Sequence, residues 1–241
     1  ANADNIDPRE YNIDVEKRDI TDKWLISKLN KLIKEVTSAY EEYDLTKVTK
    51  AIIVFLNDDL SNWYIRSNRR RFWESELTES KKAVYLTTYE VLLTLTKLTA
   101  PITPYISEEI YKCLTNKESV HLEDFPKYDD SLINESIENQ MDLIRDICSL
   151  GRFAREEAKI KVRQPISELI LDSNDEKTIG NLQVIIKEEL NVKNIIFIKD
   201  MDKYMEYIVK PNFREVGKLF GPKVNMFAET LKTLSHDEIS K

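Results

Sequence analysis

The stretch NWYIRSNRRRFW (62–73) combines the residue types best suited to contacting a nucleic acid. It contains four arginines and no acidic residue. Arg66, Arg69 and Arg70 are spaced i, i+3 and i+4, so on a helix their guanidinium groups share one face. Guanidinium groups match phosphate oxygens with paired hydrogen bonds and also stack on bases. Aromatic residues bracket the arginines, namely Trp63, Tyr64, Phe72 and Trp73. This combination is typical of proteins that read single-stranded RNA loops.

Two further windows are basic, although the chain as a whole is acidic. Residues 152–163 (RFAREEAKIKVR) and 210–223 (KPNFREVGKLFGPK) each have a net charge of +3, beside +4 for residues 62–73. The whole chain of 241 residues has a net charge of −7. A polyanionic partner is therefore compatible with the sequence if the three windows converge in space. The acidic remainder is interpreted as favouring solubility and rejecting non-cognate polyanions.

The other polar residues form no recognisable catalytic or metal-binding pattern. His121 and His236 lack a Cys, Asp or Glu partner at a metal-ligand spacing. The 4 glycines are too scattered for a P-loop or a dinucleotide fingerprint, and no GxSxG elbow is present. The acid pairs Glu108–Glu109 and Asp58–Asp59 are interpreted as solvated helix faces or caps. We therefore expect no metal, no cofactor and no catalysis in this chain alone.

The sequence also gives expectations about membrane insertion, secretion and the redox state of the cysteines. No apolar run approaches the roughly 20 residues that a membrane helix requires, and the first residues lack the basic and apolar regions of a secretory signal. Cys113 and Cys148 both lie among helix-patterned apolar residues. They are predicted to be buried free thiols in a reducing compartment.

Apolar residues recur at helical spacing over the first two thirds of the chain. We expect a first helix capped by Thr21 or Asp22, and a second that begins after Asp44. If the second helix continues unbroken, it carries the arginine run at its far end, standing out from the bundle. A third helix is expected after Ser80 and ends before Pro101. Further helices are predicted from Thr103–Pro104 onward and over about 133–161, the last with Ile137, Met141, Ile144, Ile147 and Ala154 on its inner side.

The periodicity changes near residues 163–166. Residues 168–172 and 195–198 are predicted to be short buried strands, with an amphipathic helix at about 175–190 between them. A third strand is expected at 206–210, and a helix from Asn212 to Gly221. The chain is therefore predicted to be mainly α, with a helical bundle over 21–163 followed by a small α+β module over 164–241.

Segment 58–73 (DDLSNWYIRSNRRRFW) resembles the anticodon-binding-domain motif of class I isoleucyl-tRNA synthetases. Other segments resemble the same family in the same order, particularly its eukaryote-like type: DKWLISKLNKLI (22–33), LTAPITPYISEEIY (98–111), SVHLEDFP (119–126), SLGRFAREEAKIKVRQP (149–165), KEELNVKNI (187–195) and YIVKPNFREVGKLFG (207–221). Residues 1–20 are similar to the connector from the catalytic half. The HIGH-type and KMSKS-type signatures of adenylate formation are absent, as is any editing domain.

The resemblance implies a module that recognises the anticodon stem-loop of tRNA. The parent enzyme would attach isoleucine to its tRNA with ATP and Mg²⁺, in the cytoplasm and as a monomer. Its catalytic domain would be the protein partner of this module. The fragment itself would be inactive, and would act by holding the tRNA so that the acceptor end reaches a distant active site.

The resemblance also implies roles for individual residues. Phosphates or anticodon bases would be contacted by the arginine run, with an aromatic plate beside it: Arg66, Arg69, Arg70, Arg71, and Trp63 or Trp73. The stem backbone would be held by Arg152, Arg155 and Lys161. A second recognition surface would comprise Lys210, Asn212, Phe213 and Arg214, with Asn212 and Phe213 suited to reading a base.

Several alternatives remain open on the sequence alone. Trp63 is equally explained by core packing, and the arginines by ion pairs with acids on neighbouring helices. Lys161 and Arg163 fit an interdomain salt bridge, and Arg155 followed by two glutamates fits a solvated face. For the whole chain, the alternatives are the equivalent fragment of a valyl-tRNA synthetase and a helical scaffold for a protein partner.

Overall fold

The computed structural model describes residues 6–200 and Met226. The chain divides into two compact units, the first of which comprises the residues up to Gln164 together with Asn181–Asn191. Within the described residues, the second comprises Pro165–Gly180 and residues 192–200. The strand expected at 206–210 and the helix expected at 212–221 lie outside the described residues. None of the helices in the described ranges combines the length and the apolarity needed to span a membrane.

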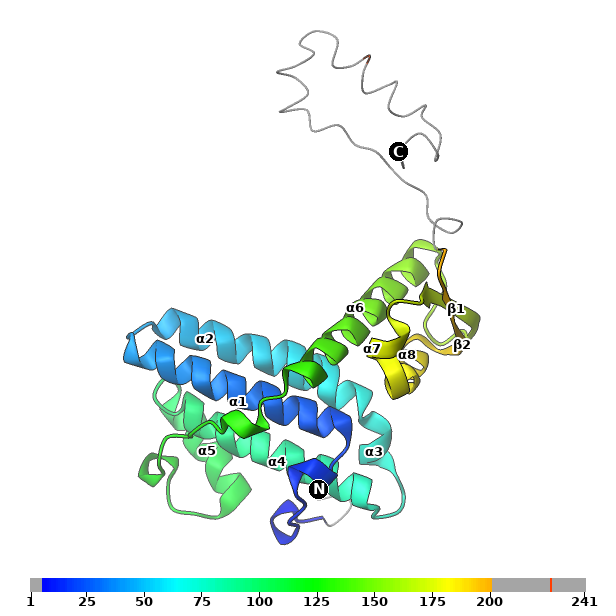
Figure 1. Cartoon of the computed structure of the whole chain (residues 1–241). Helices are drawn as coiled ribbons and strands as arrows, with labels where there is room; N and C mark the ends of the chain where they lie inside the picture. The colour runs from blue at the N-terminus through cyan, green and yellow to red at the C-terminus, as the bar shows by residue number, and fades with distance from the viewer. Residues whose placement is uncertain (1–5, 201–225, 227–241) are drawn as a thin grey trace. The chain divides into compact units, whose positions relative to one another are not determined.

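The first unit is a helical bundle built around one long central helix. Helix α1 (Ile20–Glu41) lies between α2 (Leu45–Val54) and α4 (Glu79–Thr99) (Figure 1). The other helices of this unit are α3 (Arg69–Trp73), α5 (Pro104–Thr115), α6 (Glu135–Glu157) and α8 (Gln183–Leu190). The core of α1 includes Trp24, Leu25, Leu29, Ile33 and Val36, which recur at helical spacing and are at most 4% exposed.

The starts of α2 and α5 follow the sequence prediction. Asp44 caps α2 by accepting a hydrogen bond from the Lys47 N–H, and Pro104 occupies the first turn of α5, as predicted. The cap predicted at Thr21 or Asp22 is wrong, and the third helix begins before Ser80 rather than after it. Asp19 caps α1, since its side chain accepts from the Thr21 N–H, and Thr78 caps α4 by accepting from the Lys81 N–H.

The second predicted helix does not continue through the arginine run. Helix α2 passes into a π-helical segment, Phe55–Ile65, and the chain turns at Asn68 before α3. Asn68 is buried, and the Tyr64 carbonyl accepts both from its backbone N–H at 3.1 Å and from its side-chain amide at 2.9 Å. The side-chain oxygen of Asn68 accepts from the Thr21 hydroxyl at 3.0 Å, which ties this turn to α1. Helix α3 then packs on α4, where Phe72 meets Tyr85 edge to face at 5.3 Å. The prediction that the arginine run stands out from the bundle is therefore wrong.

Helix α6 is shorter than the predicted span 133–161. Asn134 caps its first turn, and a positive φ of 56° at Lys159 follows its last turn. Met141, Ile144 and Ile147 are buried as predicted, whereas Ala154 is exposed. Gly151 allows α8 to approach α6 closely, because a Cβ at this position would overlap the Leu190 Cδ1.

The second unit contains two parallel strands, β1 (Ile166–Asp172) and β2 (Val192–Ile198). Their register pairs Ile166 with Val192 and Asp172 with Ile198. The helix predicted between them is divided into α7 (Glu176–Ile179) and α8, since Gly180 has a φ of 49° and a ψ of −125°, outside the α-helical region. The prediction of a mainly α fold with a small α+β module is confirmed.

A buried ion pair connects α1, α3 and α4. Asp22 is fully buried, and Arg71 donates to both of its carboxylate oxygens at 2.9 and 2.7 Å. Arg71 also donates to the Ser80 hydroxyl and carbonyl of α4 at 2.8 and 2.9 Å. The Tyr64 hydroxyl donates to the same carboxylate. Burial, the largest cause, and the Asp22 charge together raise the pKa of Tyr64, so this phenol stays protonated as a donor.

We expect Asp22→Asn to lower the free energy of unfolding by about 3 kcal/mol, because it leaves a largely buried guanidinium without its counter-charge. Urea unfolding of the wild-type and variant chains measures the change. Asp14→Asn is the matched control, since Asp14 pairs with Lys17 in an exposed bridge of 3.0 Å. Equal shifts for the two variants would contradict a structural role for the buried pair.

Candidate nucleic-acid interface

The arginine run of residues 66–71 is divided between solvent and protein. Arg69 and Arg70 are exposed, and Trp73 is 76% exposed. The Arg69 guanidinium lies 5.8 Å from the centroid of the Trp73 ring, within the range of a cation–π contact. This pair offers a flat aromatic surface beside a positive charge, a combination that suits an unpaired base and its phosphate.

Arg71 faces the opposite way. Its side chain is 12% exposed and is held by Asp22 and Ser80. Burial tends to lower the pKa of Arg71, and the Asp22 carboxylate more than offsets this, so its pKa is raised and the charge is fixed. The structure thus places Arg71 in the bundle rather than on the surface that carries Arg69 and Arg70.

Trp63 is also internal. It is 3% exposed, and its ring and that of Trp24 lie 5.9 and 5.6 Å from the Arg145 guanidinium. Arg145 in turn pairs with Asp59 at 2.7 Å. Trp73 is therefore the aromatic ring of this region that is open to a base, and Trp63 packs in the core.

Arg66 and Arg152 meet at one carboxylate of α8. Arg66 forms an ion pair with Glu189, and Arg152 donates to the same oxygen, Oε2, at 3.0 Å. Beside them, Arg70 forms an ion pair with Glu188. These glutamates lie within segment 187–195 of the family resemblance, but no sequence pattern marks them as partners of the arginines. Ion pairing of the arginines with acids on neighbouring helices was an alternative left open by the sequence.

The basic window of residues 152–163 is also divided between buried and exposed side chains. Arg155 is 4% exposed, and its guanidinium donates to four backbone carbonyls, those of Lys161, Gln164, Leu190 and Asn191, at 3.1, 3.0, 2.5 and 3.3 Å. The interpretation of Arg155 as part of a solvated face is therefore wrong. Lys161, by contrast, is exposed. Lys210, Asn212, Phe213 and Arg214 lie outside the described residues, so the second recognition surface stays a prediction.

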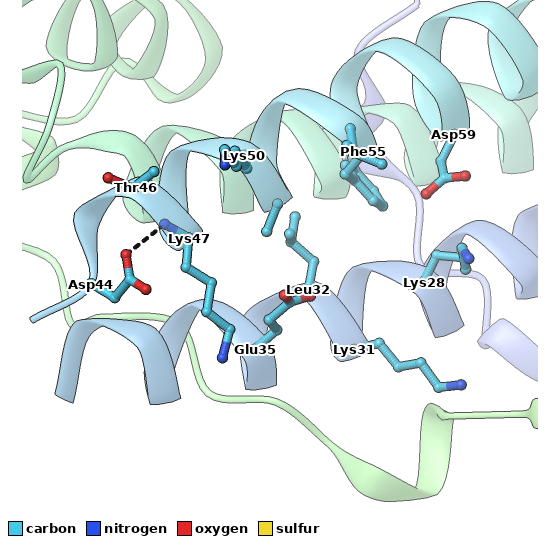
Figure 2. Close-up of a pocket in the computed structure, with 12 residues that line it drawn as sticks. Lys28, Lys31, Leu32, Glu35, Asp44, Thr46, Lys47, Lys50, Phe55 and Asp59 are labelled. Carbon is cyan, nitrogen blue, oxygen red and sulfur yellow. Dashed lines mark hydrogen bonds between the residues drawn. The ribbon is translucent and has the colours of Figure 1, made fainter. Parts of the chain in front are cut away.

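A groove of about 650 Å³ lies between α1 and α2 (Figure 2). Four lysines line it together with three acidic residues, namely Lys28, Lys31, Lys47, Lys50, Glu35, Asp44 and Asp59. Two of the acids already have partners, since Asp44 caps α2 and Asp59 pairs with Arg145. Burial raises the pKa of Asp59, against the opposing effect of Lys28 and Arg145. Among the described residues, no three His, Cys, Asp or Glu side chains gather as a metal site.

We expect Arg155→Lys to lower the free energy of unfolding by about 2–3 kcal/mol, because one ammonium cannot reach four carbonyls and leaves buried acceptors unpaired. Denaturant unfolding followed by circular dichroism measures the change. Arg163→Lys, at an exposed arginine in the same window, is the control and is expected to change little. A stability loss no larger than that of the control would show that the carbonyl contacts are dispensable.

The two cysteines differ in environment, which corrects the prediction that both are buried. Cys113 is exposed and Cys148 is buried. Burial, reinforced by Glu189, raises the pKa of Cys148 to about 12, so this thiol stays protonated at neutral pH.

We therefore expect one fast and one protected thiol in the native chain. A chromogenic disulfide reagent at pH 8 is expected to modify one thiol per chain, and the second only in denaturant. Cys113→Ser is expected to abolish the fast reaction. Two fast equivalents in the native wild-type chain would contradict the assignment.

Comparison with known proteins identifies the family of this chain. Residues 22–170 match the family model described as "Anticodon-binding domain of tRNA ligase". The chain is 40% identical over 248 residues to an isoleucine–tRNA ligase of Clostridium tetani (strain Massachusetts / E88), a match that covers 100% of this chain and 24% of that protein.

Two further relatives are also isoleucine–tRNA ligases. An isoleucine–tRNA ligase of Clostridium novyi (strain NT) is 40% identical over 100% of this chain and 23% of its own length. The isoleucine–tRNA ligase 2 of Bacillus thuringiensis subsp. konkukian (strain 97-27) is 40% identical over 99% of this chain and 23% of its own length. The chain thus spans about a quarter of the length of these curated relatives. Its helical bundle, with the exposed Arg69–Trp73 pair on α3, belongs to the family of anticodon-binding domains of tRNA ligases.

Proposed function

We propose that this chain recognises the anticodon stem-loop of an isoleucine-accepting tRNA on behalf of an isoleucine–tRNA ligase. The observation that carries the proposal is the exposed platform of Arg69, Arg70 and Trp73 on a domain of this family. The relatives of this chain favour the isoleucine enzyme over the valine enzyme. Arg66, Arg152 and Lys161 extend the same proposal to the stem backbone, and Lys210, Asn212, Phe213 and Arg214 to a second surface.

Within this proposal the residues differ in what they do. Trp73 stacks on an unpaired base, and Arg69 contacts the adjacent phosphate while resting on the same ring. Arg71 acts through α3, since its bonds to Asp22 and Ser80 fix the helix that presents the other two. Phosphate contacts of this kind fix the position of the RNA, and base contacts supply the sequence preference.

The whole enzyme would attach isoleucine to its tRNA using ATP with Mg²⁺. The 241-residue sequence contains neither the HIGH-type nor the KMSKS-type signature of adenylate formation, so we infer that this chain contributes binding energy and not chemistry. The family resemblance further supports a monomeric, cytoplasmic enzyme whose own catalytic domain is the protein partner of this module.

A titration with tRNA tests the proposal. We expect the chain to bind an isoleucine-accepting tRNA more tightly than a copy with a swapped anticodon. The slope of log affinity against log salt should correspond to about 4–6 phosphate contacts. Trp73→Ala is expected to weaken binding by about 1–3 kcal/mol through lost stacking, and Arg69→Gln to reduce the salt slope by about one contact.

Lys47→Gln provides the control, because Lys47 pairs with Glu42 at 3.9 Å in the first turn of α2, away from the end of that helix that leads to the arginine run. Its titration curve should overlay that of the wild-type chain. Absence of tRNA binding, or an equal loss of affinity in the control, would refute the proposal and favour the alternative of a helical scaffold for a protein partner.

A further inference from the structure

Helix α8 presents two consecutive carboxylates to the arginines that the proposed function assigns to RNA. Glu188 forms an ion pair with Arg70, and Glu189 forms ion pairs with both Arg66 and Arg152. Three of the candidate phosphate ligands therefore already have an anionic partner within the chain. An RNA phosphate that reaches any of them must compete with a carboxylate for the same guanidinium group.

The two carboxylates differ in how easily they can be displaced. The Glu189 side chain is 11% exposed and serves two arginines, which are 38% and 30% exposed. Its removal would leave two partly buried cations unpaired, so we assign Glu189 a structural role. The Glu188 side chain is 37% exposed and its partner Arg70 is 80% exposed. Exposed pairs of this kind contribute little to stability and open readily.

Arg70 lies next to the Arg69–Trp73 platform in the same short helix. A tRNA whose base stacks on Trp73 brings its neighbouring phosphate close to Arg70 and can displace Glu188. An RNA that lacks this stacking contact has only charge with which to compete, and meets a guanidinium that is already neutralised. The Arg70–Glu188 pair therefore disfavours weakly placed phosphates more than well placed ones.

We propose that Glu188 is a specificity-determining residue, which occupies Arg70 as an internal substitute for phosphate until a correctly positioned RNA displaces it. The inference rests on the proposed function, because it requires that RNA phosphates approach α3. It assigns a role to part of the acidic surface, namely competition with RNA at one defined guanidinium group.

The test uses the whole 241-residue chain, with an isoleucine-accepting tRNA and the same tRNA with a swapped anticodon as probes. We expect Glu188→Gln to tighten binding of the swapped tRNA by about two- to fivefold, the range that an exposed ion pair can supply. The preference for the cognate anticodon should fall. Glu188→Asp, which keeps the charge on a shorter side chain, should tighten binding less than Glu188→Gln.

A double-mutant cycle separates competition at Arg70 from a general change of charge. Glu188→Gln should have no effect on affinity when Arg70→Gln is also present. Glu41→Gln, at an exposed glutamate at the end of α1, removes the same charge elsewhere and should leave the affinity unchanged.

The outcomes distinguish this inference from the proposed function. If the wild-type chain prefers the cognate tRNA but Glu188→Gln binds as the wild type does, only the role of Glu188 is refuted. The same holds if the gain persists in the Arg70→Gln background or is matched by Glu41→Gln. If neither the wild-type chain nor Glu188→Gln binds either tRNA, the proposed function is refuted as well.

Discussion

The geometry of the candidate interface depends on the buried carboxylate of Asp22. An ionised carboxylate inside a helical bundle is tolerated only with a counter-charge and hydrogen bonds, and Arg71 supplies both. Once Arg71 faces inward, helix geometry determines where its neighbours lie, because successive residues are turned by about 100° around the axis. Arg69 and Arg70 are consequently exposed, and Trp73 lies one turn beyond Arg69, against its guanidinium group.

Local signals in the sequence were sufficient for most of the fold. The apolar spacing of α1, the Asp44 cap, Pro104 at the start of α5 and the presence of the two strands all depend on residues a few positions apart, and each was predicted correctly. The prediction that the strands are buried is wrong, since Val192 is the one buried residue in the two. One error has a non-local cause, since the turn at Asn68 depends on a contact with Thr21 as well as on Tyr64. The misplaced starts of α1 and α4 are local errors, because Asp19 and Thr78 cap these helices through N–H groups two and three residues further along the chain.

The candidate site was predicted by residue type but not by role. The four arginines at 66–71 look alike in the sequence, yet one is buried against Asp22, two pair with α8 and one rests on Trp73. The carboxylate partners of Arg66, Arg70 and Arg71 lie 49 to 123 residues away along the chain, so no local pattern distinguishes these three arginines. Trp63 and Trp73 differ for the same reason, since the burial of Trp63 depends on Trp24 and Arg145.

Arg155 shows how an internal arginine can still affect the charge at the surface. Its guanidinium group binds the carbonyls of Leu190 and Asn191, and so it fixes the end of α8 directly after Glu188 and Glu189. The close approach at Gly151 holds the same helix against α6. Because Arg155 binds the backbone at the end of α8, and the Leu190 side chain packs at Gly151 of α6, the two carboxylates are presented from an anchored helix. Glu188 can therefore compete for Arg70 without first ordering a loop. A carboxylate on a flexible segment would lose conformational entropy on pairing and would compete less effectively.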